Sequence, residues 1–166
     1  MPSAEVVRTV NIAWDGAQQR FTASGTHQGH SIDINAPHTD DPDHAPTGFS
    51  ASELLLASVG SCSLWDVVEI LRKARQDVTD IKVRVQGEQD PDPPWAYRRI
   101  TVHFVVAGAR LRRPAVERAV RLSCDRYCSV IATLRGVAEV VSSVDIAGDA
   151  GALDGSAAAA DGSSAG

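Results

Sequence analysis

Aromatic residues and cysteines are scarce in this 166-residue chain, and neither sign of charge dominates it. Its net charge of −5 and its short, interrupted arginine clusters lack the basic footprint of a nucleic-acid-binding protein. No apolar run approaches the roughly 20 residues needed to span a bilayer, and the N-terminus shows no basic segment followed by an apolar one. These absences predict a soluble, cytoplasmic protein that binds neither nucleic acid nor membrane.

Cysteine occurs three times, at Cys62, Cys124 and Cys128, and an odd count does not suggest a framework of structural disulfides. In a cytoplasmic protein the thiols are expected to be reduced. Any disulfide formed here would therefore serve catalysis rather than stability.

Length and composition predict a single domain over residues 1–147, because the chain is too short for two comfortable hydrophobic cores. After Ala147 the sequence becomes "GDAGALDGSAAAADGSSAG", which has too little apolar bulk to offset the entropy cost of ordering. Residues 148–166 are predicted to form a disordered tail.

Hydrophobic periodicity predicts strands on both sides of a long helix. The segments with alternating apolar residues are 10–14, 21–23, 32–34, 80–86 and 100–106. Ser50 and Glu53 have capping-box spacing, which predicts Ser50 as the N-cap of a helix that runs to about Gln76. A second helix over residues 114–122, a third helix and a final strand near Ile146 complete an α+β domain.

The local surroundings of the two cysteines in helices differ. Cys62 lies about three turns into the long helix, beyond the reach of that helix's own dipole. Residues 54–60 are small or apolar on nearly every side, which predicts burial all round, so this thiol is either core packing or a reactive sulfur shielded from water. Cys128 would fall in the first turn of the third helix if Asp125 caps it, and local physics then predicts Cys128 as the more acidic thiol.

Two cysteine motifs in this order resemble a known family. The segment "ELLLASVGSC", ending at Cys62, and the later segment "DRYCSVIATL", around Cys128, are similar to the OsmC/Ohr family of osmotically inducible and organic hydroperoxide resistance proteins. The resemblance extends from about Val6 to Ile146 through the order of strands and helices. It implies an OsmC-like fold, with antiparallel sheets wrapped around long buried central helices in an intertwined homodimer.

The same resemblance implies thiol-dependent peroxidase chemistry that uses no cofactor and serves oxidative stress defence. Cys62 matches the peroxidatic cysteine, whose thiolate attacks an organic hydroperoxide and becomes a sulfenic acid. Cys128 matches the resolving cysteine, which would form a Cys62–Cys128 disulfide. A dithiol or a lipoylated protein would then reduce that disulfide by exchange.

The groups expected beside the peroxidatic thiolate match the family only partly. Hydroperoxide reductases of this family place an arginine and a glutamate there, and the glutamate position is Ser52 in this chain. Glu53 is the neighbouring candidate, with a capping-box role as the alternative. Arg20 is the candidate arginine unless it simply faces solvent, and Arg126 is a second one. Trp65, three residues after the peroxidatic cysteine, is expected to line the substrate pocket.

Metal binding is not expected from the remaining polar clusters. The C-x3-C pair of Cys124 and Cys128 lacks the second close pair of a structural zinc site, so Cys124 is either core packing or a competing resolving thiol. Histidines and aspartates of residues 27–44 either form a solvated loop or bind a metal.

Two functions follow from this sequence. The retained cysteine pair favours the peroxidase. The serine at the family glutamate position favours a non-catalytic or redox-sensing OsmC-like protein that binds a small apolar ligand at the dimer interface.

Overall fold

The computed structural model describes residues 6–17, 20–26, 29–34 and 48–147. The predicted C-terminal tail and most of the loop rich in histidine and aspartate lie outside these ranges. The chain forms two compact units, residues 1–57 and 58–166, which we describe separately. The single domain over residues 1–147 stays a prediction.

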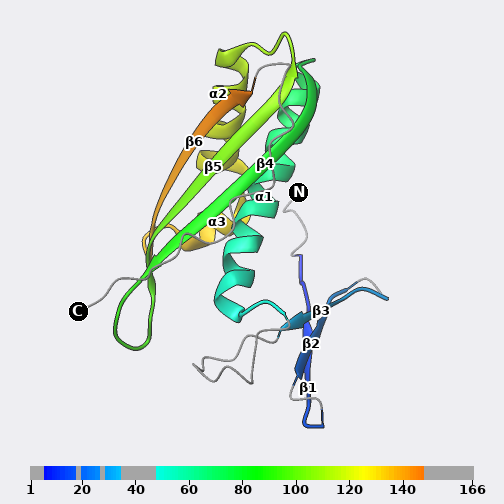
Figure 1. Ribbon diagram of the computed structural model, residues 1–166, viewed down its shortest axis with the longest axis vertical. Coiled ribbons are helices and arrows are strands. Elements are labelled where there is room, and N and C mark those ends of the chain that lie inside the picture. Colours follow the sequence, from blue (N-terminus) through cyan, green and yellow to red (C-terminus); the bar gives the residue numbers. More distant parts are fainter. Residues whose placement is uncertain (1–5, 18–19, 27–28, 35–47, 148–166) are drawn as a thin grey trace, which may run out of the picture. The chain divides into compact units, whose positions relative to one another are not determined.

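The N-terminal unit contains a small antiparallel sheet with the strand order β1-β2-β3 (Figure 1), and its strands lie where the alternation predicted strands. Its strands are β1 (Asn11–Asp15), β2 (Arg20–Ser24) and β3 (Ser31–Ile34). Large apolar side chains of this sheet are between 45% and 62% exposed in the single chain: Ile12, Trp14, Phe21 and Ile32. Such a grouping is typical of a surface that packs against another protein element.

Helix α1 (Ala51–Lys73) begins at the predicted capping box. The Ser50 N–H donates to Glu53 Oε2 at 2.8 Å, and the Glu53 N–H donates to Ser50 Oγ at 3.1 Å. Hydrogen bonds from the backbone and then the hydroxyl of Ser50 lower the pKa of the Glu53 carboxyl. The helix ends slightly earlier than predicted, because Arg75 adopts a left-handed backbone conformation with a φ of 54°.

Burial of α1 is less complete in the single chain than the sequence predicted. Within residues 54–60 only Val59 and Gly60 are buried, and further along the helix Trp65 and Val68 are 72% and 42% exposed. Burial on all sides would require another surface to cover the helix, and the described residues of the chain do not supply it.

Among the described helices, α1 alone is long and apolar enough to cross a membrane by length and composition. The helix passes this test on its average hydropathy, whereas Asp66 and Glu69 interrupt its apolar run as the sequence indicated. The finding is weak support for a membrane span, since the core helix of a soluble protein passes the same test. Val67 and Leu71 are fully buried in the C-terminal unit.

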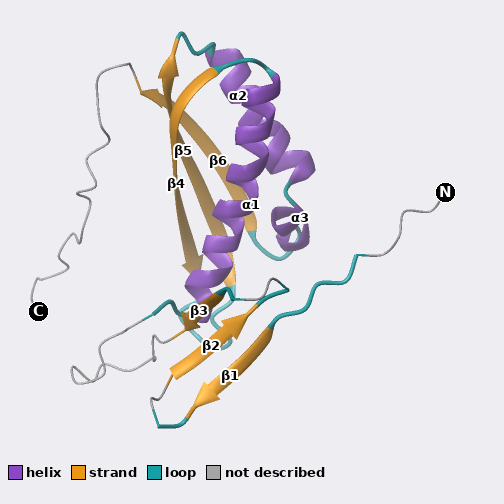
Figure 2. Cartoon of the chain, turned by 90° about the vertical axis from the view of Figure 1, so that its right-hand side faces the viewer, coloured by secondary structure: helices purple, strands orange, loops and turns teal. Residues whose placement is uncertain are grey.

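The C-terminal unit is a three-stranded sheet with its helices on one face (Figure 2). Its strands are β4 (Asp77–Gln89), β5 (Tyr97–Ala109) and β6 (Glu139–Ala147). The inward side chains of β5 are fully buried: Ile100, Val102, Phe104 and Val106. Gly60 lets α1 approach this face closely, because a Cβ there would lie 2.9 Å from Val85 Cγ2.

The α+β class is confirmed, and the second sheet is mixed rather than purely antiparallel. Strands β4 and β5, at the two alternating segments 80–86 and 100–106, pair antiparallel, whereas β6 pairs parallel to β5. A parallel neighbour requires a crossover connection. The helices between β5 and β6 provide it.

That crossover comprises α2 (Arg113–Leu122), a π-helical turn η1 (Ser123–Tyr127) and the short helix α3 (Ser129–Leu134). The expected Asp125 cap is wrong, because the Cys128 N–H donates to the Ser123 carbonyl, five residues back, at 2.9 Å. Cys128 is itself the N-cap of α3, and its Sγ accepts from the Ile131 N–H at 3.5 Å.

Candidate redox site

The two motif cysteines lie together in the C-terminal unit. Cys62 is half-buried on α1, and Cys128 is 2% exposed at the start of α3. Each thiol affects the pKa of the other, so the two side chains are neighbours, and Cys62 Sγ lies 3.9 Å from Ser129 Oγ. The site is therefore a pair of free thiols held between two helices.

The pKa of the Cys62 thiol is lowered. Partial burial acts to raise this pKa, but it is outweighed by hydrogen bonds from the Val130 N–H, the Cys128 thiol, and the hydroxyl and N–H of Ser129. The first turn of α3 thus supplies donors that favour a thiolate on α1. Ionisation of Cys62 therefore does not depend on the dipole of α1, the helix that carries it.

The pKa of the Cys128 thiol is raised to about 12. Burial is the main cause, and it exceeds the opposing effect of the Ile131 N–H. The adjacent Cys62 adds to the rise through its hydrogen bond and its negative charge. The predicted order of acidity is therefore wrong: Cys62 is the more acidic thiol of the pair and Cys128 the less acidic one.

Sequence reasoning missed the donors from Ser129 and Val130. It considered each cysteine against its own helix, whereas the N–H groups of α3 act on a sulfur that belongs to α1. The available signal for these donors was the sequence "CSV" at residues 128–130, which places a hydroxyl residue directly after Cys128.

The other residues predicted for the site have partners of their own. Arg20 NH1 lies 3.5 Å from Asp33 Oδ2, while its buried Nε has no hydrogen-bond partner among the residues that the structure describes. Glu53 is engaged in the capping box. The Arg126 guanidinium lies over the ring of Tyr127, 5.7 Å from its centroid. Catalytic roles for Arg20 and Glu53 stay predictions.

Cys124 is a buried thiol in η1, 6% exposed, and burial raises its pKa. Its carbonyl accepts from Arg135 NH2 at 2.6 Å, which ties η1 to the end of α3. No cluster of metal-ligating side chains occurs within the residues that the structure describes. Of the histidines in the N-terminal loop, His27, His38 and His44 lie outside those residues.

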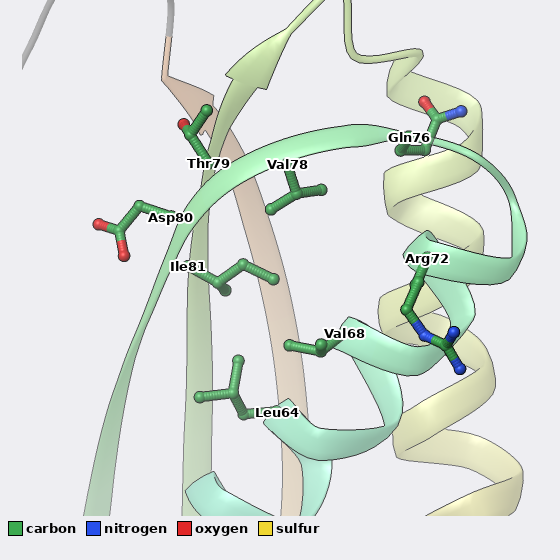
Figure 3. A pocket seen from close by; sticks show the side chains of 8 residues that line it. All are labelled: Leu64, Val68, Arg72, Gln76, Val78, Thr79, Asp80 and Ile81. Carbon is green, nitrogen blue, oxygen red and sulfur yellow. The ribbon is translucent and has the colours of Figure 1, made fainter.

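A pocket of about 420 Å³ lies between the second half of α1 and the beginning of β4 (Figure 3). Its apolar walls are Leu64, Val68, Val78 and Ile81, and its polar lining residues are Arg72, Gln76, Thr79 and Asp80. Neither a cysteine nor Trp65 lines it. Its size and apolar walls are suited to a small apolar ligand.

Comparison with known proteins identifies the family of this chain. The model of the family described as OsmC-like protein matches residues 41–142. Protein YhfA of Escherichia coli K12 is 38% identical over 118 residues, which cover 71% of this chain and 84% of that protein. The chain belongs to the OsmC-like family.

Solved structures show the same fold. A hypothetical protein from Aquifex aeolicus VF5 has a TM-score of 0.74 and 29% identity, covering 88% of this chain and 100% of that one. The organic hydroperoxide resistance protein OhrB of Bacillus subtilis has a TM-score of 0.57 and 17% identity, covering 84% of this chain and 98% of its own. At that identity the likeness to OhrB concerns the fold alone.

Proposed function

We propose that this protein is a cytoplasmic, thiol-dependent peroxidase that reduces organic hydroperoxides in oxidative stress defence. The observation that carries the proposal is the asymmetry of the thiol pair, in which Cys62 has a lowered pKa and Cys128 has a raised one. A nucleophilic thiolate beside a protonated thiol is what the peroxidatic and resolving steps require. Membership of the OsmC-like family supports a redox role.

In the first step the Cys62 thiolate attacks a hydroperoxide oxygen and the O–O bond breaks. Cys62 becomes a sulfenic acid, and the alkoxide leaves as an alcohol after it takes up a proton. The lost thiolate charge no longer opposes ionisation of Cys128, which lowers the barrier to its deprotonation.

In the second step the Cys128 sulfur attacks the Cys62 sulfenic sulfur and water leaves, so that a Cys62–Cys128 disulfide forms. An external dithiol, such as a lipoylated protein, then reduces this disulfide by two successive exchanges and is itself oxidised. Arg20 and Glu53 are secondary candidates for charged groups beside the sulfur, and Trp65 is a secondary candidate for a wall of the substrate site.

A homodimer is part of this proposal. The apolar side chains exposed on the N-terminal sheet and along α1, such as Trp14 and Trp65, support it because a soluble single chain rarely leaves so many uncovered. We expect the mass measured in solution by light scattering to be that of two chains. A folded species with the mass of one chain would contradict the dimer.

The turnover assay follows consumption of cumene hydroperoxide with dihydrolipoamide as the reductant. We expect consumption to be faster than with the reductant alone, and faster than with hydrogen peroxide in place of cumene hydroperoxide, because an apolar surround favours apolar substrates. A rate with protein equal to the rate without it would reject the peroxidase.

A non-catalytic or redox-sensing protein that binds a small apolar ligand is the second candidate. The pocket walled by Leu64, Val68 and Ile81 supports the ligand-binding part of this second candidate. Slow oxidation of the thiols together with saturable binding of an apolar dye would support this candidate over the peroxidase.

A further inference from the structure

Ser123 connects the two halves of the thiol pair. Its hydroxyl, on a fully buried side chain, donates to the main-chain carbonyl of Ser63 at 2.9 Å. Ser63 directly follows Cys62 on α1. The carbonyl of Ser123 accepts from the Cys128 N–H at 2.9 Å. One residue therefore links the backbone beside Cys62 to the backbone of Cys128.

Asp66 contacts the Ser123 hydroxyl that makes this link. It lies one turn after Cys62 on the same side of α1, and its Oδ2 is 3.3 Å from Ser123 Oγ. Desolvation raises the pKa of the Asp66 carboxyl, although the hydrogen bond with Ser123 acts against that rise. A half-buried carboxyl beside a buried hydroxyl costs solvation free energy, so its presence here requires a compensating contact. Ser123 is that contact.

The π-helical turn η1 couples the position of Ser123 to that of Cys128. Because η1 is wider than an α-helical turn, Ser123 and Cys128 are hydrogen bonded across it, and a shift of Ser123 is transmitted to Cys128. The first turn of α3 follows directly, with the Ser129 and Val130 N–H groups that act on Cys62. Both the resolving thiol and the donors to the thiolate thus depend on the same anchor.

We propose that Ser123, supported by Asp66, is the positioning residue of this redox site, which holds Cys128 and the first turn of α3 against Cys62. The inference rests on the thiol pair of the proposed function. It adds that the rate of disulfide formation is set by the contact between η1 and α1.

Diamide tests this without relying on peroxidase activity. The Cys62 thiolate adds to the N=N bond of diamide, and Cys128 then displaces the hydrazine, so that two thiols are oxidised and one diamide is reduced. We expect Ser123→Ala to form the Cys62–Cys128 disulfide about tenfold more slowly than the parent, because a buried hydrogen bond is worth about that factor. The pH dependence of the rate of Cys62 alkylation should also shift to higher pH in this variant.

Two kinds of control separate positioning from general loss of stability. Ser61→Ala removes a hydroxyl next to Cys62 that donates to the Ser58 carbonyl of its own helix, and it should behave like the parent. Asp66→Asn should form the disulfide at close to the parent rate, because its amide can hydrogen bond to Ser123, whereas Asp66→Ala should be slower. The Asp66 variants retain the Ser123 hydroxyl. If Ser123→Ala does not fold, disulfide formation by Asp66→Ala at the parent rate overturns the proposal, and slower formation supports it.

A folded Ser123→Ala variant with the parent's disulfide rate and alkylation profile would overturn the proposal. Equal rates for Asp66→Ala and Asp66→Asn would remove Asp66 from it. If the parent forms the disulfide with diamide but does not reduce cumene hydroperoxide, the proposed peroxidase fails, while slower disulfide formation by Ser123→Ala with diamide still supports the positioning role. If the parent consumes hydroperoxide and Ser123→Ala matches it with both oxidants, the positioning role alone fails.

Discussion

Cys62→Ser is expected to abolish the reaction of this protein with organic hydroperoxides, while Cys128→Ser should stop it one step later. A serine hydroxyl is not ionised at neutral pH and is not oxidised by hydroperoxides, so the first variant has no peroxidatic nucleophile. The second variant keeps the nucleophile and lacks the resolving thiol. Its Cys62 should remain a sulfenic acid that a dimedone probe can trap.

Titration of free thiols after one equivalent of cumene hydroperoxide measures this. The parent should lose two thiols, Cys128→Ser one and Cys62→Ser none, as the sulfenic acid and disulfide steps require. Cys124→Ala is the matched control, because it removes a buried thiol whose side chain is not among the groups that act on Cys62. It should still lose two thiols by the same steps. Parent thiols that survive for hours would contradict the account.

Selective alkylation of Cys62 at neutral pH is the second large effect. With a pKa of about 12, Cys128 is a thiolate to only about one part in 10⁵ at pH 7, whereas the lowered pKa of Cys62 keeps its thiolate fraction higher than that of an ordinary cysteine. Labelling of Cys62 by iodoacetamide should rise with pH up to its lowered pKa and then level off. Labelling of Cys128 should continue to rise through the alkaline range.

The measurement is peptide mass spectrometry after brief labelling at a series of pH values between 5 and 10, a window chosen around the ordinary thiol pKa of about 8.5. Unfolded protein provides the control, since both cysteines should then titrate alike. Faster labelling of Cys128 than of Cys62 in the folded protein at pH 7 would show that the acidity of the pair is assigned the wrong way round.

Much of the fold could be predicted because its determinants are local. The capping box of Ser50 and Glu53 specified where α1 begins, and alternation in β5 specified which side chains are buried. The parallel pairing of β6 could not be read from its own residues, because it depends on the crossover through α2 and α3.

The site was only partly predictable for the same reason. The two motifs identified Cys62 and Cys128, and the structure brings these thiols together. The acidity of each thiol, however, depends on residues distant in the sequence: the N–H groups of Ser129 and Val130 act on α1, and burial acts on Cys128. The cap at Cys128 was missed because a π-helical turn has no clear sequence pattern.

The serine at position 52 raised the question of what holds Cys62 as a thiolate without the family glutamate. In this structure the lowered pKa is accounted for by the first turn of α3 and by the Cys128 thiol. These donors are present in the described part of the chain whatever the roles of Glu53 and Arg20. Ser52 is thus compatible with an ionised Cys62.

Mapping the disulfide after one equivalent of cumene hydroperoxide tests the central claim most directly, which is that Cys62 is oxidised and Cys128 resolves it. The account predicts a cross-linked peptide that joins Cys62 to Cys128, which appears within the time of hydroperoxide loss and disappears on addition of dihydrolipoamide. Hydroperoxide loss with Cys128 still free, or a disulfide from Cys62 to Cys124 instead, would contradict it.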